Sequence, residues 1–497
     1  MAAVGGVGAR SLLLTKSLVD MRTQLGDLQR QMATGKKSDT YAGIGIDRGL
    51  TVGLRSHLSA LQSYGDSITN VDVRLKLAQT TLSRIDELGR QVKAATAPAS
   101  TSSPQMTQQL AVSSLGEILG LLNTQAGDRY LFSGQASDQP SVETLEHILD
   151  GDGARAGLKQ IISERNQADL GASGLGRLNV SAPSLTSVQL AEEAPPTVFG
   201  FKLTSIASGL TGSTVTGPAG VPPAMSVDLG ATNPTAGETV KFTLALPDGS
   251  SETLTLTATA SATPGPNEFT IGASSDLTAA NLQTALTTSL GDLADTALTA
   301  ASARAASEDF FNIDAANPPQ RVAGSPLTAT ALTNGTPTNT VTWYTGEAGS
   351  TSARSTATAK VDQSISVSYG TRANEEGIRW QIQQIATLAA IPLPAAGPNT
   401  DAISAELNER IRPDLDVPPG TQSIEAIQAE LAGAQTTLAA AKDRHTQTNA
   451  TLSDFLQNIE GVSNEEVAAQ IMAMQTTLQA TLQTTAMLYQ TSILKYL

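Results

Sequence analysis

The chain of 497 residues contains no cysteine, and only 3% of its residues are aromatic and 15% charged. Without cysteine there is no disulfide framework, no thiol catalysis and no cysteine-based zinc site. The low aromatic and charged contents are unlike those of an ordinary compact enzyme. Acidic residues outnumber basic residues by 46 to 31, and the net charge of −15 argues against binding to nucleic acid or to an anionic membrane.

Long apolar runs are also missing from the sequence. No stretch approaches the ~20 apolar residues that are needed to cross a bilayer, so we expect no membrane insertion. The segment 1–14 lacks a basic region in front of a long apolar stretch, which predicts that there is no cleavable signal peptide. If the protein is extracellular, we therefore expect it to be exported by a route that needs no such signal.

Proline is absent from both ends of the chain. All 23 prolines lie between Pro98 and Pro419. Because a proline inside a helix costs about 3 kcal/mol, the two proline-free ends can form long helices and the middle cannot.

Apolar residues in the two ends recur in alternating steps of three and four, the pattern of helices that pack along one stripe. The first stripe consists of Leu14, Leu18, Met21, Leu25, Leu28 and Met32, and the second of Val71, Leu75, Ala78, Leu82 and Ile85. The longest consists of Ile424, Ile427, Leu431, Ala434, Leu438, Ala441, His445, Thr448, Leu452, Phe455 and Ile459. It predicts a coiled-coil helix about 55 Å long.

A last helix is predicted after Gly461, because the segment 463–466 has the sequence of a capping box. Its apolar residues are Val467, Ile471, Met474, Leu478, Leu482 and Leu488. Thr481, Thr485 and Ser492 lie on or near the same stripe, and charges are few between Glu466 and Lys495. A helix with so little charge around its circumference is usually buried on several sides. We expect the N- and C-terminal stripes to pair with each other, rather than to form two separate hairpins, and further copies of the chain to enclose the last helix.

The middle of the chain has a different pattern. Val240, Phe242, Leu244 and Leu246 alternate before a turn at 247–250, and Leu254 and Leu256 alternate after it, which predicts a β-hairpin. Phe269 and Ile271 indicate a further strand, and a short helix is predicted to begin at Ser275 or Asp276.

These patterns predict a mainly α fold, in which long paired N- and C-terminal coiled-coil helices form a stem and an α+β outer domain is inserted in the middle. The expected domains are a terminal helical assembly domain of 1–45 with 460–497, a helical stem domain of 46–193 with 361–459 that includes a small β region, and a variable outer insert of 194–360.

No motif in the sequence predicts catalysis. The three histidines, His57, His147 and His445, are far apart, and His445 on its stripe is expected to be a packed, hydrogen-bonded side chain rather than a ligand. The segment 150–153 resembles the start of a calcium loop, but the twelfth position is Ile161 instead of glutamate. We therefore expect no enzymatic activity, no cofactor and no metal.

Five segments together resemble the bacterial flagellin family. They are Ser17–Lys37, Gly53–Val92, Gly127–Gly134 with the sequence GDRYLFSG, Tyr369–Glu375 with the sequence YGTRANE, and Leu478–Leu497. The resemblance covers 1–180 and 361–497, and the insert is similar in kind to the variable outer domains of flagellins. It implies a subunit of the extracellular flagellum that is exported unfolded through a narrow channel, folds at the growing tip and serves motility.

The resemblance further implies terminal helices that fold on assembly. The implied partners are copies of the chain, the hook, junction and cap proteins of the flagellar axis, and an export chaperone. The residues expected to form the self-assembly seam are Leu14, Leu18, Met21, Leu25, Leu28, Met32, Ile471, Met474, Leu478, Leu482 and Leu488.

Two alternatives remain at this point. The ending Ser492–Leu497 is similar to that of the related protein that joins the hook to the filament, whereas the length and the large insert are ordinary for a flagellin. A surface adhesin with a coiled-coil stalk is a remote alternative from another class, although adhesins normally carry an export signal or an anchor.

Overall fold

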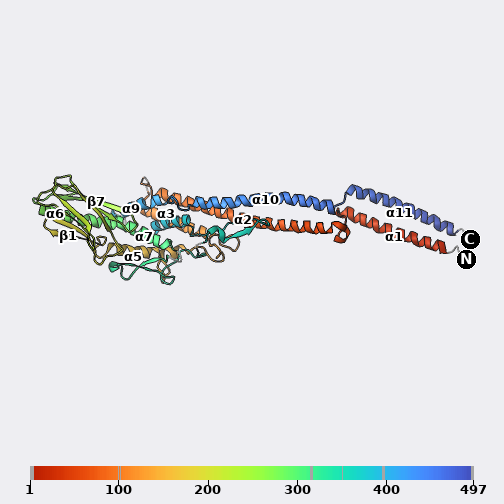
Figure 1. Cartoon of the computed structure of the whole chain (residues 1–497), viewed down its shortest axis with the longest axis horizontal. Helices are drawn as coiled ribbons and strands as arrows, with labels where there is room; N and C mark the ends of the chain where they lie inside the picture. Colours follow the sequence, from red (N-terminus) through yellow and green to blue (C-terminus); the bar gives the residue numbers. More distant parts are fainter. Residues whose placement is uncertain are drawn as a thin grey trace. The chain divides into compact units, whose positions relative to one another are not determined.

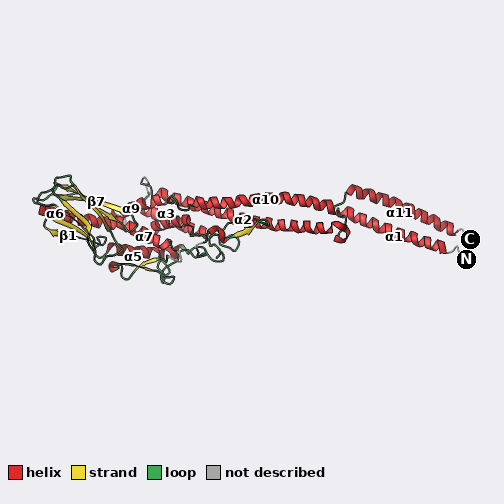
Figure 2. Cartoon of the chain, viewed as in Figure 1, coloured by secondary structure: helices red, strands yellow, loops and turns green. Residues whose placement is uncertain are grey.

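The computed structural model describes residues 5–98, 100, 102–313, 317–349, 351–394 and 398–493. It is a mixed α/β structure in which helices predominate and the sheets are small (Figure 2). The chain divides into two compact units. We call 1–70 with 359–367 and 436–497 the terminal unit, and 71–358 with 368–435 the central unit.

The terminal unit contains the first and last helices of the chain, α1 (Gly5–Thr34) and α11 (Asn464–Ile493), which lie side by side (Figure 1). A short 3-10 helix, Tyr41–Asp47, follows α1. The unit also contains the first part of α2 (Arg48–Ala95) and the last part of α10 (Ile424–Glu460). Long helices in the proline-free ends are therefore confirmed. Of the helices in the described residues, none combines the length and the apolarity needed to cross a membrane.

The apolar stripe of α2 is buried where it was predicted, whereas that of α10 is buried only in its first part. The stripe of α2 from Val71 to Ile85 is buried throughout, and that of α10 is buried from Ile424 to His445. Further along α10, Leu452 and Ile459 are half-buried. Thr448 is exposed and Phe455 is 55% exposed, so the prediction is wrong for these two residues. The helix turns every 3.6 residues, so a strict seven-residue pattern drifts away from the packed face.

In the central unit, α3 (Pro104–Leu122) packs on α8 (Glu376–Ala390), and α5 (Leu158–Leu170) packs on α7 (Thr299–Phe311). The remaining helices include α4 (Leu145–Asp150) and α9 (Pro398–Asp414). Phe311 accepts a hydrogen bond at its carbonyl oxygen from the indole nitrogen of Trp343, which is fully buried (3.0 Å).

Two four-stranded sheets complete the central unit. The first has the order β1-β2-β5-β4 and the second the order β3-β6-β7-β8. The strands are β1 (Leu178–Ser184), β2 (Ser187–Glu192), β3 (Lys202–Ser208), β4 (Thr214–Ala219), β5 (Ala224–Asp228), β6 (Thr239–Ala245), β7 (Ser251–Thr259) and β8 (Glu268–Thr270). Paired neighbours are antiparallel, except that β7 and β8 are parallel.

The predicted hairpin is confirmed as β6 and β7, with Phe242 opposite Leu254. A helix is confirmed where one was predicted, α6 (Ser275–Leu293), and Ser274 caps it by accepting a hydrogen bond from the backbone nitrogen of Leu277 (3.4 Å). It is not short, because it continues through the π-helical segment Ala294–Leu298 into α7. The expectation that the middle of the chain forms no long helix is therefore wrong.

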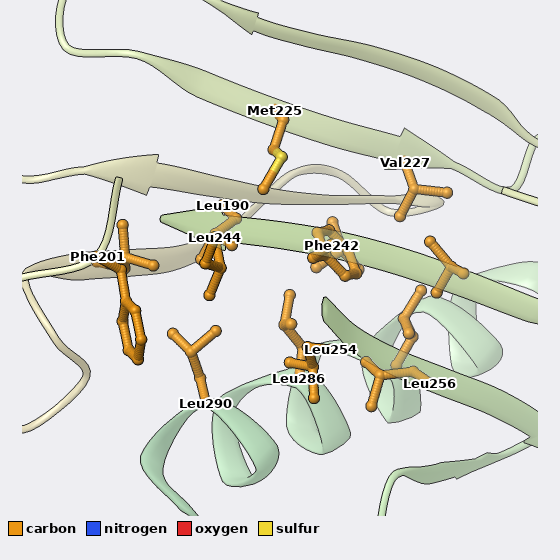
Figure 3. Close-up of a cluster of buried hydrophobic side chains, with 14 of the residues drawn as sticks. Leu190, Phe201, Met225, Val227, Phe242, Leu244, Leu254, Leu256, Leu286 and Leu290 are labelled. Carbon is orange, nitrogen blue, oxygen red and sulfur yellow. The ribbon is translucent and has the colours of Figure 1, made fainter. Parts of the chain in front are cut away.

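Both sheets pack on α6 to form one apolar core. Figure 3 shows strand residues such as Phe242 and Leu190 facing Leu286 and Leu290 of the helix. Alternate residues of a strand point to the same face, and residues four apart in a helix lie on one side, which explains why these positions are apolar. The sheet β1-β2-β5-β4 contains residues from both sides of position 194, where the insert was predicted to begin.

Short strands make two further pairs. In the central unit, β9 (Gln320–Val322) pairs with β10 (Leu332–Asn334). The pair of β11 (Thr358–Lys360) and β12 (Ser366–Ser368) encloses the segment 361–365.

Candidate assembly surface

The expected seam residues of α1 and α11 form two stripes of half-buried side chains. On α1 these are Leu14, Leu18, Met21, Leu25 and Leu28, whereas Met32 is exposed. On α11 they are Ile471, Met474 and Leu478. The structure thus brings together eight of the eleven expected residues on two paired helices. The side chain of Leu488 and the end of the chain, 494–497, lie outside the described residues.

Leu482 lies beside the seam of α11 rather than on it. The more protected positions are Val467, Ile471, Met474 and Leu478, followed by Thr481 and Thr485, whereas Leu482 is 43% exposed. The spacing of these positions is the three-and-four pattern continued through two threonines. Each threonine hydroxyl donates to the carbonyl oxygen four residues earlier (2.7 Å), so its polar group is satisfied within the helix. The prediction that Thr481 and Thr485 lie on or near the seam is therefore confirmed, whereas the prediction that Leu482 lies on it is wrong.

The helix pair also has apolar side chains outside its seam. Leu12 and Leu13 of α1 are largely exposed, and Met472 and Met487 of α11 are 63% and 64% exposed. At about 100° per residue, Met472 and Met487 lie far around α11 from the seam. No charged residue occurs from Val467 to Ile493, so this outer surface of α11 carries no charge.

The contact between α1 and α11 buries little within one chain. From Leu12 to Thr34 no side chain is fully buried, and from Asn464 to Met487 only Val467 is. Ordering a residue of backbone costs about 1–2 kcal/mol, which such shallow burial offsets poorly. The pair therefore presents two helices whose apolar surface is only partly covered.

Backbone contacts tie the pair together at its base. The backbone nitrogen of Lys37 donates to Glu460 (2.7 Å), and that of Val462 donates to Gly35 (3.1 Å). The carboxylate of Glu460 is buried and accepts two hydrogen bonds from Arg55, at Nε (3.0 Å) and Nη2 (2.6 Å). Such a bidentate pair fixes geometry as well as charge.

The cap of α11 is confirmed in its main contact. Ser463 Oγ accepts a hydrogen bond from the backbone nitrogen of Glu466 (3.3 Å). The Glu466 carboxylate accepts a hydrogen bond from the side chain of Gln470 (3.3 Å). This cap sets the residue at which α11 begins and therefore the residues that face α1.

His445 is buried on its stripe of α10 as predicted, but neither of its ring nitrogens has a hydrogen-bond partner among the described residues, so the predicted hydrogen bonding is wrong. Its ring lies 5.8 Å from that of Tyr64, and Nε2 is 3.6 Å from Asp362 Oδ2. Arg444 donates to Asp362 (2.7 Å) and lowers the pKa of that carboxyl group. Among the described residues, no group of three or more histidine, aspartate or glutamate side chains is placed to hold a metal ion.

Two of the segments that carry the family resemblance hydrogen-bond to each other. The backbone nitrogen of Ala373 donates to Phe132 (2.8 Å), that of Gly134 donates to Thr371 (3.2 Å), and the Thr371 hydroxyl donates to Leu131 (2.6 Å). These segments are more than two hundred positions apart in the sequence, so no local pattern could predict their pairing.

Comparison with known proteins adds no assignment. No model of a known protein family matches this chain, and no curated protein matches it. Function is therefore inferred from the geometry of the terminal helices and from the sequence pattern.

Proposed function

We propose that this chain is a structural subunit of the bacterial flagellum, a flagellin without enzymatic activity, that self-assembles through its terminal helices into the extracellular filament. The observation that carries this proposal is the α1–α11 pair, with its shallow seam and an outer face of α11 that carries no charge and exposes Met472 and Met487. An apolar seam that is only partly covered, with further large apolar side chains exposed beside it, favours an interaction site. The resemblance of five segments to flagellins supports the same conclusion.

The proposal extends to the architecture. In it, α1 and α11 are the assembly element, α2 and α10 form a stem, and the two sheets with α6 belong to an outer domain. The partners are copies of the chain, the hook, junction and cap proteins, and an export chaperone. The absence of cysteine favours export in an unfolded state, because no crosslink can form on the way.

Assembly would be driven by coupled folding and binding. Neighbouring copies would bury the outer face of α11 and cover the seam more completely. The free energy gained from this burial offsets the conformational entropy that is lost when the two helices become ordered. Contacts between unlike surfaces of successive copies do not close on themselves, so they extend into an open helical array.

The test is a negative charge introduced on α11 at Leu482, beside the seam. We expect Leu482→Asp to abolish polymerisation, because a carboxylate buried between copies has no partner. The matched control is Leu277→Asp, which makes the same change at an exposed position of α6 in the central unit, away from α11. Polymers are measured by sedimentation and electron microscopy, and the fluorescence of the buried Trp343 reports that the central unit is folded. Normal polymers from Leu482→Asp would contradict the proposal.

The number of copies in each flagellum distinguishes a flagellin from the junction protein, whose ending resembles that of this chain. Sheared extracellular appendages are analysed by mass spectrometry, with the other axial proteins as references. A flagellin dominates the mass of this fraction, whereas a junction protein is present at trace level beside hook components. Absence of the chain from the fraction would rule out a flagellar role.

A further inference from the structure

A polar pocket of about 340 Å³ lies in the central unit. It is lined by one face of α2, by the segment 129–137, and by the segments 356–358 and 369–371. Arg74 and Arg129 both line it, together with Tyr130 and Tyr369. None of the described residues that line the pocket carries a carboxylate.

The two arginines of this pocket have no counter-charge. Arg74 is half-buried, and its Nη1 donates to the hydroxyl group of Tyr369 (3.4 Å). Arg129 lies at the exposed rim. In the part of the chain that the structure describes, neither residue forms an ion pair, although acidic residues outnumber basic ones by 46 to 31.

A second pocket of the central unit provides the contrast. It is also lined by two arginines, Arg354 and Arg372, but Glu375 and Glu430 line it as well. Arg354 pairs with both of these glutamates, and Arg372 pairs with Glu347 (3.2 Å). The positive charge there is compensated within the chain, whereas that of Arg74 and Arg129 is not.

We infer that the pocket of Arg74 and Arg129 binds an oxyanion, either a carboxylate or a phosphate group. A guanidinium group presents several N–H donors in a plane, which suits the paired oxygens of these anions. The hydroxyl group of Tyr130 adds a further donor at the same pocket. An anion there would also relieve the repulsion between two like charges that share one cavity.

The anion has two possible sources, a free ion or an acidic side chain of a second copy of this chain. The site itself does not depend on the proposed assembly function. Its test therefore uses inorganic phosphate as the probe, and self-association is measured separately.

Binding is measured by equilibrium dialysis of the full chain against radiolabelled inorganic phosphate at constant ionic strength. We expect saturable binding that Arg74→Gln and Arg129→Gln each weaken about tenfold, because each removes charge-assisted hydrogen bonds. The matched control is Arg412→Gln, which removes an exposed arginine of α9 that does not line the pocket. Circular dichroism checks that every variant is folded. Absence of saturable binding, or equal binding by all four proteins, overturns the site.

Sedimentation of the same proteins identifies the source of the anion. If a second copy supplies it, phosphate and Arg74→Gln both weaken self-association. If a free ion occupies the site, phosphate binds while self-association is unchanged. Both outcomes support an oxyanion site at Arg74 and Arg129 and differ only in the source of the anion. Loss of polymerisation in Leu482→Asp without loss of phosphate binding would show that the pocket and the assembly surface are independent.

Discussion

At the scale of single residues, several acidic side chains stabilise turns rather than pair with cations. The carboxylate of Glu238 accepts hydrogen bonds from the backbone nitrogens of Thr211 (2.8 Å) and Thr235 (3.0 Å), and from the Thr211 hydroxyl. These bonds lower the pKa of Glu238 from 4.5 to about 2. One half-buried side chain thus joins the loop after β3 to the loop before β6.

The lowered pKa of Glu238 makes its contribution depend on pH. A carboxyl group whose pKa is lowered on folding stabilises the folded state above its unfolded value of 4.5, and this contribution is lost as pH falls through about 2. We expect Glu238→Gln to be less stable than the wild type at neutral pH, and the difference to shrink as the pH falls below 4.5.

The measurement is urea unfolding followed by far-UV circular dichroism across this pH range. The control, Glu409→Gln, removes the same charge at an exposed position of α9. A difference between Glu238→Gln and the wild type that is constant with pH would contradict the assignment.

At the scale of elements, the contact between α2 and α8 requires a glycine inside a helix. A Cβ atom at Gly89 would lie 1.9 Å from Nε2 of Gln381. That nitrogen donates to the carbonyl oxygen of Ile85 (2.6 Å), so the buried amide of α8 is held by the backbone of α2. Glycine costs about 0.5–1 kcal/mol relative to alanine within a helix, and here the close approach of two helices explains its presence.

Two glycine-to-alanine substitutions distinguish the effect of helix propensity on stability from the effect of packing. We expect Gly89→Ala to destabilise the central unit by about 2 kcal/mol, because the methyl group displaces Gln381 and leaves a buried polar group without its partner. Gly120→Ala in α3 should stabilise it by about 0.5–1 kcal/mol, because a Cβ there meets nothing within 4 Å.

Both effects are read from urea unfolding by tryptophan fluorescence, since Trp343 and Trp380 belong to the central unit. Trp380 is adjacent to Gln381 in α8. A shift of the same sign in both variants would contradict the packing explanation.

At the scale of the whole molecule, burial differs strongly between the paired terminal helices and the helices of the central unit. The stripe of α2 from Val71 to Val92 is fully buried, whereas α1 has no fully buried side chain from Leu12 to Thr34. Local stability follows local burial, so separate parts of one chain open with different free energies.

Hydrogen exchange tests this difference. In the monomer we expect the amides of α1 from 12 to 34 and of α11 from 468 to 487 to exchange rapidly, and those of α3, α8 and the segment 71–92 to be protected. In polymers the terminal helices should become protected as well, because neighbouring copies cover them. Equal protection of both groups in the monomer would exclude coupled folding and assembly.

Much of the local structure could be predicted from the sequence. Proline-free ends with apolar residues in steps of three and four predicted the long helices, and period-two alternation around 247–250 predicted the hairpin of β6 and β7. These features depend on hydrogen bonds and side chains within a few residues of each other, so the signal is contained in short windows.

Only the tertiary structure decided which side chains meet. It placed Leu482 beside the seam rather than on it, and it exposed Phe455. It also joined β2 to β5 across position 194 and brought Arg74 and Arg129 to one pocket. Such contacts depend on the rotation of each helix, on strand order and on close approach between distant segments. A local pattern determines that a helix or strand forms, and the packing of the chain determines what it faces.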